Sequence, residues 1–160
     1  ETLFPQSRCV PDSEQDAFYQ QAFFNSDRRY NEDLTLSPVF LFAILLWHPF
    51  KKLMGSTYFR NKNFETKLEQ ALHAVCSVQK QKVAMSQKLI LGIKDIYRMQ
   101  YLFMDYAQLK QRKHASQMRF RASLDFLILR AQLGEVNPFL AIDWVDYRKH
   151  NGSREQSRKY

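Results

Sequence analysis

The stretch Ser37-Pro-Val-Phe-Leu-Phe-Ala-Ile-Leu-Leu-Trp-His-Pro-Phe50 is the most apolar part of a chain that is otherwise rich in charged residues. Ser37 followed by Pro38 is a favoured helix start, because serine caps the first turn and proline suits the first helical position. The apolar run from Val39 to Trp47 is much shorter than the roughly 20 residues that a transmembrane helix needs. A helix that is apolar on every side is buried on every side. The stretch therefore predicts a core helix; the alternative is a partner surface covered by a further part of the protein.

Similar helix signals recur along the chain, and no segment shows the alternating pattern of a strand. The expected caps are Ser13, Asn63, Ser86, Ser116 and Asn137, the last followed by Pro138, and Gly134 suits a position just after a helix end. The expected helices cover residues 13–24, 37–48, 63–81, 86–111, 116–133 and 137–147. Together they predict an all-α fold, a single helical-bundle-like domain of about six helices around a buried central helix at residues 38–48.

Connections are expected at residues 25–35 and 51–62, which are polar or contain Gly55. We expect residues 1–36 to be an N-terminal helix and loop left from a preceding region, and residues 37–150 to form the helical C-terminal domain. Residues 151–160 are expected to be a basic, disordered tail. The chain begins with Glu1 instead of Met, so we expect it to be a piece of a longer protein.

Positive charge is unevenly distributed along the chain. The 160 residues hold 24 Lys and Arg against 16 Asp and Glu, which gives a net charge of +8. Residues 1–50 hold three basic and seven acidic side chains, whereas residues 51–160 hold twenty-one and nine. Such an excess is typical of a surface that binds a polyanion, either nucleic acid or an acidic membrane. A solvated basic surface without a dedicated partner is the alternative, and acid-free clusters favour nucleic acid over it.

Three stretches, 80–94, 110–121 and 148–159, contain most of this charge. The middle stretch spans a predicted connection and the next helix start, where backbone N–H groups add to the side-chain charge. Arginine can fork onto a phosphate and stack on a base, while lysine supplies a point charge. The candidate RNA-binding residues are Lys94, Arg98, Lys110, Arg112, Lys113, His114, Arg119, Arg121, Arg148 and Lys149.

Binding of single-stranded RNA also uses aromatic side chains on which bases stack. Tyr97, Tyr101 and Tyr106 lie shortly before the middle basic stretch and are candidates for that role. Tyr97 and Tyr106 belong to an apolar stripe at helical spacing, so a core position is the favoured reading for these two.

No catalytic set or metal site can be assembled from the residue pattern. The four histidines accompany no nucleophile motif, and the acids are scattered, whereas two-metal phosphoryl transfer needs clustered carboxylates. His73 lies three residues before Cys76, but no further zinc ligand is nearby. The two cysteines, Cys9 and Cys76, are expected to be free thiols in a reducing cytoplasm. We therefore predict no catalytic residue, no metal and no cofactor in this chain, and a cytoplasmic location.

Four strings of residues stand in a specific order along the chain. They are Leu34 to Pro49, Lys94-Asp-Ile-Tyr-Arg-Met-Gln100, Phe120-Arg-Ala-Ser-Leu-Asp-Phe-Leu-Ile-Leu-Arg-Ala131 and Asp143-Trp144. Together they resemble the C-terminal helical region of bacterial poly(A) polymerases, members of the nucleotidyltransferase family shared with CCA-adding enzymes. The resemblance covers residues 34–150. The chain departs from the family pattern in its short basic tail, where the family has a long arginine-rich one.

The resemblance implies a division of labour. In such enzymes a head with a Gly-Ser motif and paired aspartates uses ATP and Mg to add AMP to RNA 3′ ends, and helical parts hold the RNA. This chain shows none of the head motifs. The resemblance therefore implies that the chain binds single-stranded or hairpin RNA and that it is not an enzyme on its own. No DNA or membrane partner is expected. The alternative is a helical interaction module that docks an RNA-decay protein or the enzyme's own head, with Leu3–Phe24 as the expected docking surface.

Overall fold

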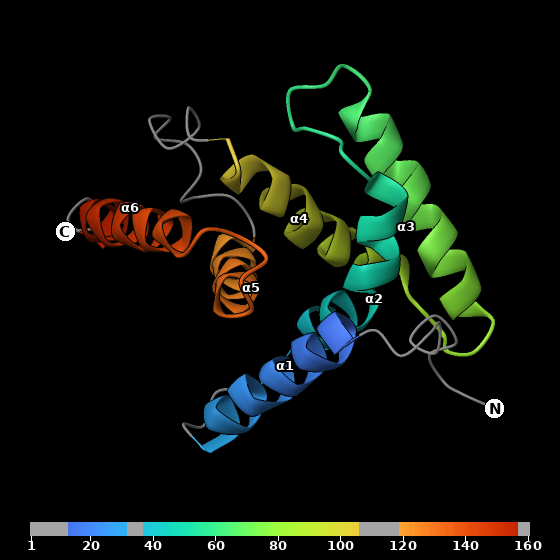
Figure 1. The fold of residues 1–160 in the computed structure, drawn as a ribbon, viewed down its shortest axis with the longest axis horizontal. Coiled ribbons are helices and arrows are strands. Elements are labelled where there is room, and N and C mark those ends of the chain that lie inside the picture. The colour runs from blue at the N-terminus through green and yellow to red at the C-terminus, as the bar shows by residue number, and fades with distance from the viewer. Residues whose placement is uncertain (1–12, 32–36, 106–118, 157–160) are drawn as a thin grey trace. The chain divides into compact units, whose positions relative to one another are not determined.

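The computed structural model describes the backbone of residues 13–31, 37–105 and 119–156, and the side chains of residues 16–25, 37–105 and 119–151. Six α-helices and no strand occur in these ranges, so the all-α prediction is confirmed (Figure 1). The helices are α1 (Ser13–Asn31), α2 (Pro38–Met54), α3 (Phe64–Lys80), α4 (Gln87–Phe103), α5 (Phe120–Gln132) and α6 (Pro138–Gln156). The contacts divide the chain into two compact units, Glu1–Lys94 and Asp95–Tyr160, with the division inside α4. The predicted domain from 37 to 150 stays a prediction.

Several helix ends differ from the predicted ones. α1 continues to Asn31 and α2 to Met54, through residues that we expected to be connections, and α6 continues to Gln156, into the expected tail. Polar composition does not end a helix where its residues still have fair helix propensity. α4 is shorter than predicted, because the chain turns at Met104, where the N–H of Asp105 donates to the carbonyl oxygen of Leu102 at 3.0 Å.

Three of the predicted helix caps are confirmed, and the side chain of Ser13 lies outside the described residues. The hydroxyl of Ser37 accepts from the N–H of Phe40 at 3.2 Å, and Ser86 and Asn137 make equivalent bonds at 3.1 and 3.0 Å. Gly134 has the left-handed φ of +75° that suits the residue after a helix end. Asn63 occupies the predicted position before α3, but its side chain makes no capping hydrogen bond, so that part of the prediction is wrong. Ser116 lies outside the described residues.

α2 runs through Pro49 without ending there. Proline has no N–H, so the carbonyl oxygen of Leu45, four residues earlier, has no helical donor. The hydroxyl of Tyr19 in α1 donates to this oxygen at 3.1 Å. The bond therefore satisfies the acceptor that the proline leaves open, and it joins α1 to α2.

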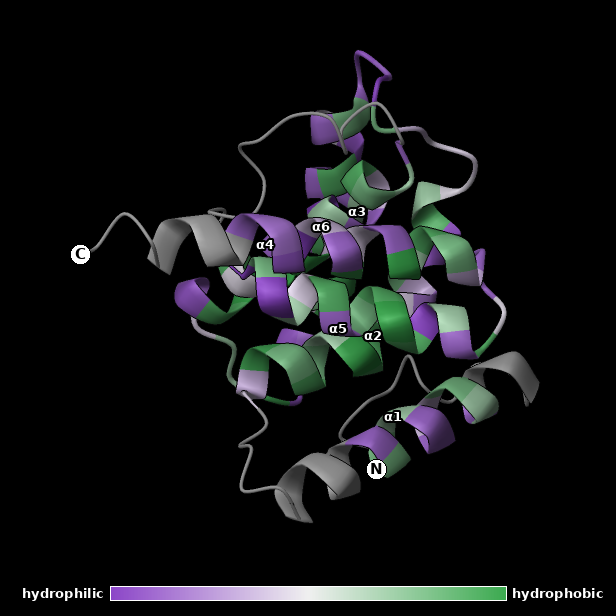
Figure 2. Ribbon diagram, turned by 90° about the vertical axis from the view of Figure 1, so that its left-hand side faces the viewer, coloured by the Kyte–Doolittle hydropathy of each residue, from purple (hydrophilic) through white to green (hydrophobic). Residues whose placement is uncertain are grey.

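The first unit is built on α2, which packs against α1 and α3. No residue from Val39 to Phe50 is exposed, which confirms the predicted core helix, and the α2 ribbon is mostly hydrophobic in Figure 2. The apolar stripe predicted for α3 is buried: Phe64, Leu68, Leu72, Val75 and Cys76. On the α1 side, the ring of Phe18 meets that of His48 edge-on, with centroids 5.0 Å apart.

The second unit has an aromatic core at the junction of α4, α5 and α6. The ring of Trp144 lies 4.8 Å from that of Phe103 and 6.3 Å from that of Phe120, between centroids. The indole N–H of Trp144 donates to the carbonyl oxygen of Phe103 at 2.9 Å. This bond lets α6 bury a polar N–H at the C-terminal end of α4, where backbone carbonyls lack helical donors.

Candidate nucleic-acid interface

The ten predicted RNA-binding residues do not form one described cluster. Lys110, Arg112, Lys113 and His114 lie outside the described residues, so that part of the prediction is not tested. Lys94 belongs to the first unit, and the other five lie in the second: Arg98 on α4, Arg119 and Arg121 at the start of α5, and Arg148 and Lys149 on α6.

Among the described candidates, Lys94, Arg119 and Lys149 face acids. The ammonium nitrogen of Lys94 lies 2.5 Å from a carboxylate oxygen of Glu69 on α3. The Nε of Arg119 lies 4.0 Å from a carboxylate oxygen of Asp95, and the Nζ of Lys149 lies 4.0 Å from one of Asp146. A neighbouring carboxylate neutralises part of the positive field, so these residues attract phosphate less than their sequence positions suggest.

The remaining three candidates differ in exposure. Arg121 is exposed, and no hydrogen bond or ion pair joins its side chain to another described side chain. Arg98 and Arg148 are half-buried. Only Arg121 among these three therefore presents its charge fully to solvent.

The charges of the described side chains in the second unit balance. Its described side chains, 95–105 and 119–151, include six Lys or Arg and six Asp or Glu. Residues 37–94 of the first unit hold nine Lys or Arg and only two Asp or Glu. The positive charge of the described residues is thus concentrated on residues 37–94, of which the sequence analysis placed only 80–94 in a basic stretch.

This excess forms two groups at opposite ends of α3 (Figure 1). At the α3–α4 turn, the exposed residues are Lys80, Lys82 and Lys88, which the sequence analysis placed in a basic stretch. The other group comprises Lys51 and Lys52 in the last turn of α2, and Arg60 and Lys62 in the α2–α3 connection, residues 55–63. The sequence analysis missed this second group. The signal that marks it is the absence of any acid between Asp33 and Glu65.

The two described candidate stacking tyrosines, Tyr97 and Tyr101, do not provide exposed platforms. Tyr97 is fully buried, as the core reading predicted, and its ring lies 6.2 Å from that of Phe126 between centroids. Tyr101 is mostly buried, and this desolvation raises the pKa of its phenol to about 12, an effect that Arg130 partly opposes. Tyr106 lies outside the described residues.

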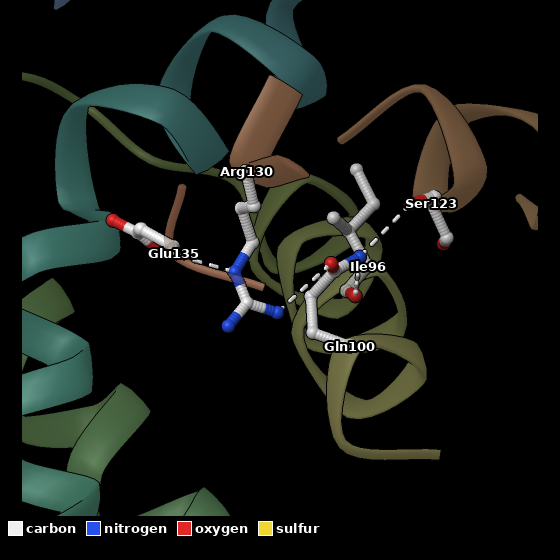
Figure 3. Close-up of polar contacts among 5 residues, drawn as sticks. All are labelled: Ile96, Gln100, Ser123, Arg130 and Glu135. Atoms are coloured by element: carbon white, nitrogen blue, oxygen red, sulfur yellow. Dashed lines mark hydrogen bonds and ion pairs between the residues drawn. The ribbon is translucent and has the colours of Figure 1, made fainter. Parts of the chain in front are cut away.

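Arg130, in the string that resembles poly(A) polymerases, has a structural role (Figure 3). Its Nε donates to a carboxylate oxygen of Glu135 at 3.1 Å, and its Nη1 lies 3.4 Å from the side-chain oxygen of Gln100. The amide nitrogen of Gln100 donates in turn to the carbonyl oxygen of Ser123 at 2.9 Å. Burial lowers the pKa of Arg130, and the charge of Glu135 opposes this shift. The network ties α4, α5 and the following turn together, and it buries the guanidinium away from any ligand.

Neither a metal site nor a membrane-spanning helix is seen in the described part of the chain. Within the described residues, no group of three or more His, Cys, Asp or Glu is placed to hold a metal ion. No described helix combines the length and the hydropathy that crossing a bilayer requires.

Comparison with known families identifies the chain. The family described as "Polymerase A arginine-rich C-terminus" matches residues 60–159, more than half of the sequence. The chain belongs to this family. Its match begins at Arg60, inside the α2–α3 connection, and it includes the whole Arg130 network.

Curated relatives of this chain carry the name "Poly(A) polymerase I". The protein from Escherichia coli O157:H7 is 29% identical over 130 residues, which are 76% of this chain and 26% of the relative. The protein from Haemophilus influenzae is 24% identical over 164 aligned residues, which cover 98% of this chain and 36% of the relative. The chain thus spans between a quarter and about a third of the length of these relatives. No solved structure matches the chain.

Proposed function

We propose that this chain is the RNA-binding C-terminal portion of a poly(A) polymerase that adds AMP from ATP to RNA 3′ ends. It holds the RNA, while ATP, Mg and the transfer chemistry belong to a catalytic head outside this chain. Its membership of the arginine-rich C-terminus family and its relatives named poly(A) polymerase I support the parent activity. A cytoplasmic location agrees with this activity and is part of the proposal.

The observation that carries RNA binding is the charge concentration on residues 37–94. Nine basic side chains accompany two acids there, and the exposed lysines gather at the two ends of α3. Backbone phosphates supply most of the affinity of such sequence-tolerant complexes, because each contact releases condensed counterions. We therefore infer that the RNA backbone follows the first unit, in addition to the predicted basic stretch from Lys110 to Arg121.

The test is fluorescence anisotropy of this chain with a labelled oligo(A) and with a mixed-sequence RNA hairpin, each over a salt series. If about four phosphates of a single strand are neutralised, the logarithm of the binding constant should fall by about three per decade of salt. Steep salt dependence with both RNAs supports the proposal, and absence of binding at low salt contradicts it. Replacing Arg112, Lys113 and Arg119 together by glutamate separates the contribution of the predicted basic stretch from Lys110 to Arg121.

A second candidate function, docking of a protein partner, is favoured by one observation. Phe23 and Phe24 on α1 are 49% and 65% exposed, and they lie in the segment Leu3–Phe24 for which we predicted a docking surface. The partner would be an RNA-decay protein or the catalytic head itself. Calorimetric titration with the separately produced N-terminal portion of the Escherichia coli relative tests this candidate, with Phe24→Ser as the variant that should weaken binding.

A further inference from the structure

Tyr58, in the α2–α3 connection, is the most exposed large hydrophobic side chain in the described part of the molecule. Its exposed fraction is 75%, whereas the tyrosines that the sequence analysis considered as platforms are buried or lie outside the described residues. A single exposed apolar residue needs no explanation by itself. The structure of the loop that carries Tyr58 and the charges around this residue need an explanation.

The loop is held by a series of hydrogen bonds. Gly55 ends α2 with a left-handed φ of +56°, and its N–H donates to the carbonyl oxygen of Lys51 at 3.1 Å. The hydroxyl of Thr57 donates to the carbonyl oxygen of Met54 at 2.6 Å. The N–H of Asn61 then donates to the carbonyl oxygen of Tyr58 itself at 3.0 Å. The backbone of Tyr58 is therefore fixed on both sides by local bonds.

The next residue anchors the loop to α3. The ring of Phe59 packs on the ring of Phe64, with centroids 5.2 Å apart, and Phe64 is 2% exposed. The N–H of Phe64 also donates to the carbonyl oxygen of Asn61 at 3.0 Å. One of two consecutive aromatic rings is thus packed against the core, while the other is presented to solvent. Because the backbone that carries Tyr58 is held in advance, less conformational entropy is lost when a ligand stacks on its ring.

The charges around Tyr58 are basic. Lys52, Arg60 and Lys62 are exposed, and no acid occurs between Asp33 and Glu65. No hydrogen bond or ion pair joins the ammonium groups of Lys52 and Lys62 to another described side chain. The strongly polar tip of this connection, residues 60–63, stands out in hydrophilic colour in Figure 2.

A comparison within the molecule shows what is specific about this ring. Phe139 on α6 is 71% exposed, but the next charged residues along its helix are Asp143 and Asp146, both exposed. Carboxylates repel phosphates, so Phe139 lacks the electrostatic surroundings for a nucleic acid. Tyr58 combines an exposed aromatic face on a hydrogen-bonded loop with lysines that pair with no described side chain, the two elements that single-strand binding sites share.

We propose that the α2–α3 connection is a subsite for single-stranded RNA, in which one base stacks on the ring of Tyr58. The phosphates on either side of that base contact Lys52, Arg60 and Lys62. This inference rests on the proposed function, and it names the place where the chain holds a base instead of only the backbone. Stacking of this kind accepts any base, because every base has a π-face.

The first test compares variants of the full chain by anisotropy with oligo(A) and with an abasic phosphodiester strand of the same length. Tyr58→Ala should weaken binding of oligo(A) by about tenfold, the size of one lost base–aromatic stack, and leave the salt slope unchanged. The same variant should bind the abasic strand like the wild type. Tyr58→Trp should keep the affinity, and Phe139→Ala is the matched control that should change neither strand.

The second test reads stacking directly. Trp47 and Trp144 are 1% and 0% exposed, so the indole introduced by Tyr58→Trp is distinguished by the red-shifted emission of an exposed ring. Oligo(A) should quench this emission, and the abasic strand should leave it unchanged. Quenching by both strands, or by neither, would overturn stacking.

The outcomes separate this inference from the proposed function. If the wild type binds oligo(A) with steep salt dependence but Tyr58→Ala binds equally well, the stacking subsite is overturned and RNA binding stands. If Tyr58→Ala loses the same affinity for the abasic strand, the ring acts on the backbone and the inference also fails. If the wild type binds no RNA at low salt, both proposals are overturned.

Discussion

The hydroxyl group of Tyr19 lies 3.1 Å from the carbonyl oxygen of Leu45, the acceptor to which Pro49 cannot donate. A bond between two helices thus replaces one bond within a helix. Tyr19→Phe removes the donor and leaves a part-buried carbonyl oxygen unpaired. We expect the free energy of unfolding to fall by about 1–2 kcal/mol, measured by urea denaturation with an unchanged m value.

A double-mutant cycle is the control for this prediction. Pro49→Ala restores a backbone N–H that can donate to Leu45 within α2. In that background Tyr19→Phe should be less destabilising, with a coupling energy of about 1 kcal/mol between the two positions. Additive effects would mean that the Tyr19 hydroxyl does not compensate for the proline.

The Arg130–Glu135 ion pair should contribute strongly to stability because it is nearly buried. The side chains of Arg130 and Glu135 are 10% and 16% exposed. Glu135→Gln removes the negative charge and leaves the guanidinium poorly compensated, so we expect a loss of about 3 kcal/mol. Glu69→Gln is the matched control, since Glu69 pairs with Lys94 but is 63% exposed, and it should be destabilising by less than about 1 kcal/mol. Equal losses of stability in the two variants would mean that burial does not strengthen the Arg130–Glu135 ion pair.

Trp47 tests whether α2 is the centre of the core. Its side chain is 1% exposed, and its ring lies 5.9 Å from that of Phe50 between centroids. Trp47→Ala should lower the free energy of unfolding by about 3–5 kcal/mol, the usual effect of emptying a large buried aromatic site. Thermal melting followed by circular dichroism measures the loss. Tyr58→Ala, at an exposed position, should change stability by less than about 0.5 kcal/mol, and similar melts for the two variants would contradict the buried position of Trp47.

The fold could be predicted from the sequence because its signals are local. The caps at Ser37, Ser86 and Asn137 and the apolar stripe of α3 depend on residues within one or two turns, and the structure confirms them. The continuation of α2 beyond Pro49 was not predicted, and the hydroxyl that bonds the carbonyl oxygen left open by the proline belongs to Tyr19, 26 residues before Leu45. Hydrophobic periodicity relates residues only a few positions apart, so it does not reveal a compensating residue this far away in the chain.

The site was harder to predict than the fold for a related reason. A cluster of like charges in sequence, such as Arg148 and Lys149, does not show which acids lie beside it in space. The partners of Lys94 and Arg119 are Glu69 and Asp95, each 24 or more residues away in the chain. The acid-free α2–α3 connection was visible in the sequence, but its aromatic residue was recognisable as a platform only once the exposure of Tyr58 was known.

The charge distribution predicts which surface matters more for RNA. Lys52 and Lys62 lie in residues 37–94, where nine basic side chains accompany two acids, whereas Arg148 and Lys149 lie in a unit whose described charges balance. Lys52→Glu with Lys62→Glu should weaken oligo(A) binding by more than tenfold and flatten the salt dependence. Arg148→Glu with Lys149→Glu, which changes the net charge equally, should have a smaller effect in the same anisotropy titration. A larger effect of the second pair would move the interface to α6.

Tyr101 predicts how stability responds to alkaline pH. Burial raises the pKa of its phenol to about 12, while an unfolded tyrosine titrates near 10, so between these values only the unfolded chain releases the proton. The contribution of Tyr101 to stability is therefore complete below about pH 10 and is lost as the pH rises toward 12. Tyr101→Phe removes this proton release, and the free energy of unfolding of the variant should fall by about 1–2 kcal/mol less than that of the wild type over this range. Urea denaturation at pH 8, 10 and 11 measures the two slopes, with pH 8 as the baseline at which the difference between the proteins is independent of titration. Parallel pH dependences would mean that the phenol of Tyr101 is as well solvated in the native chain as in the unfolded one.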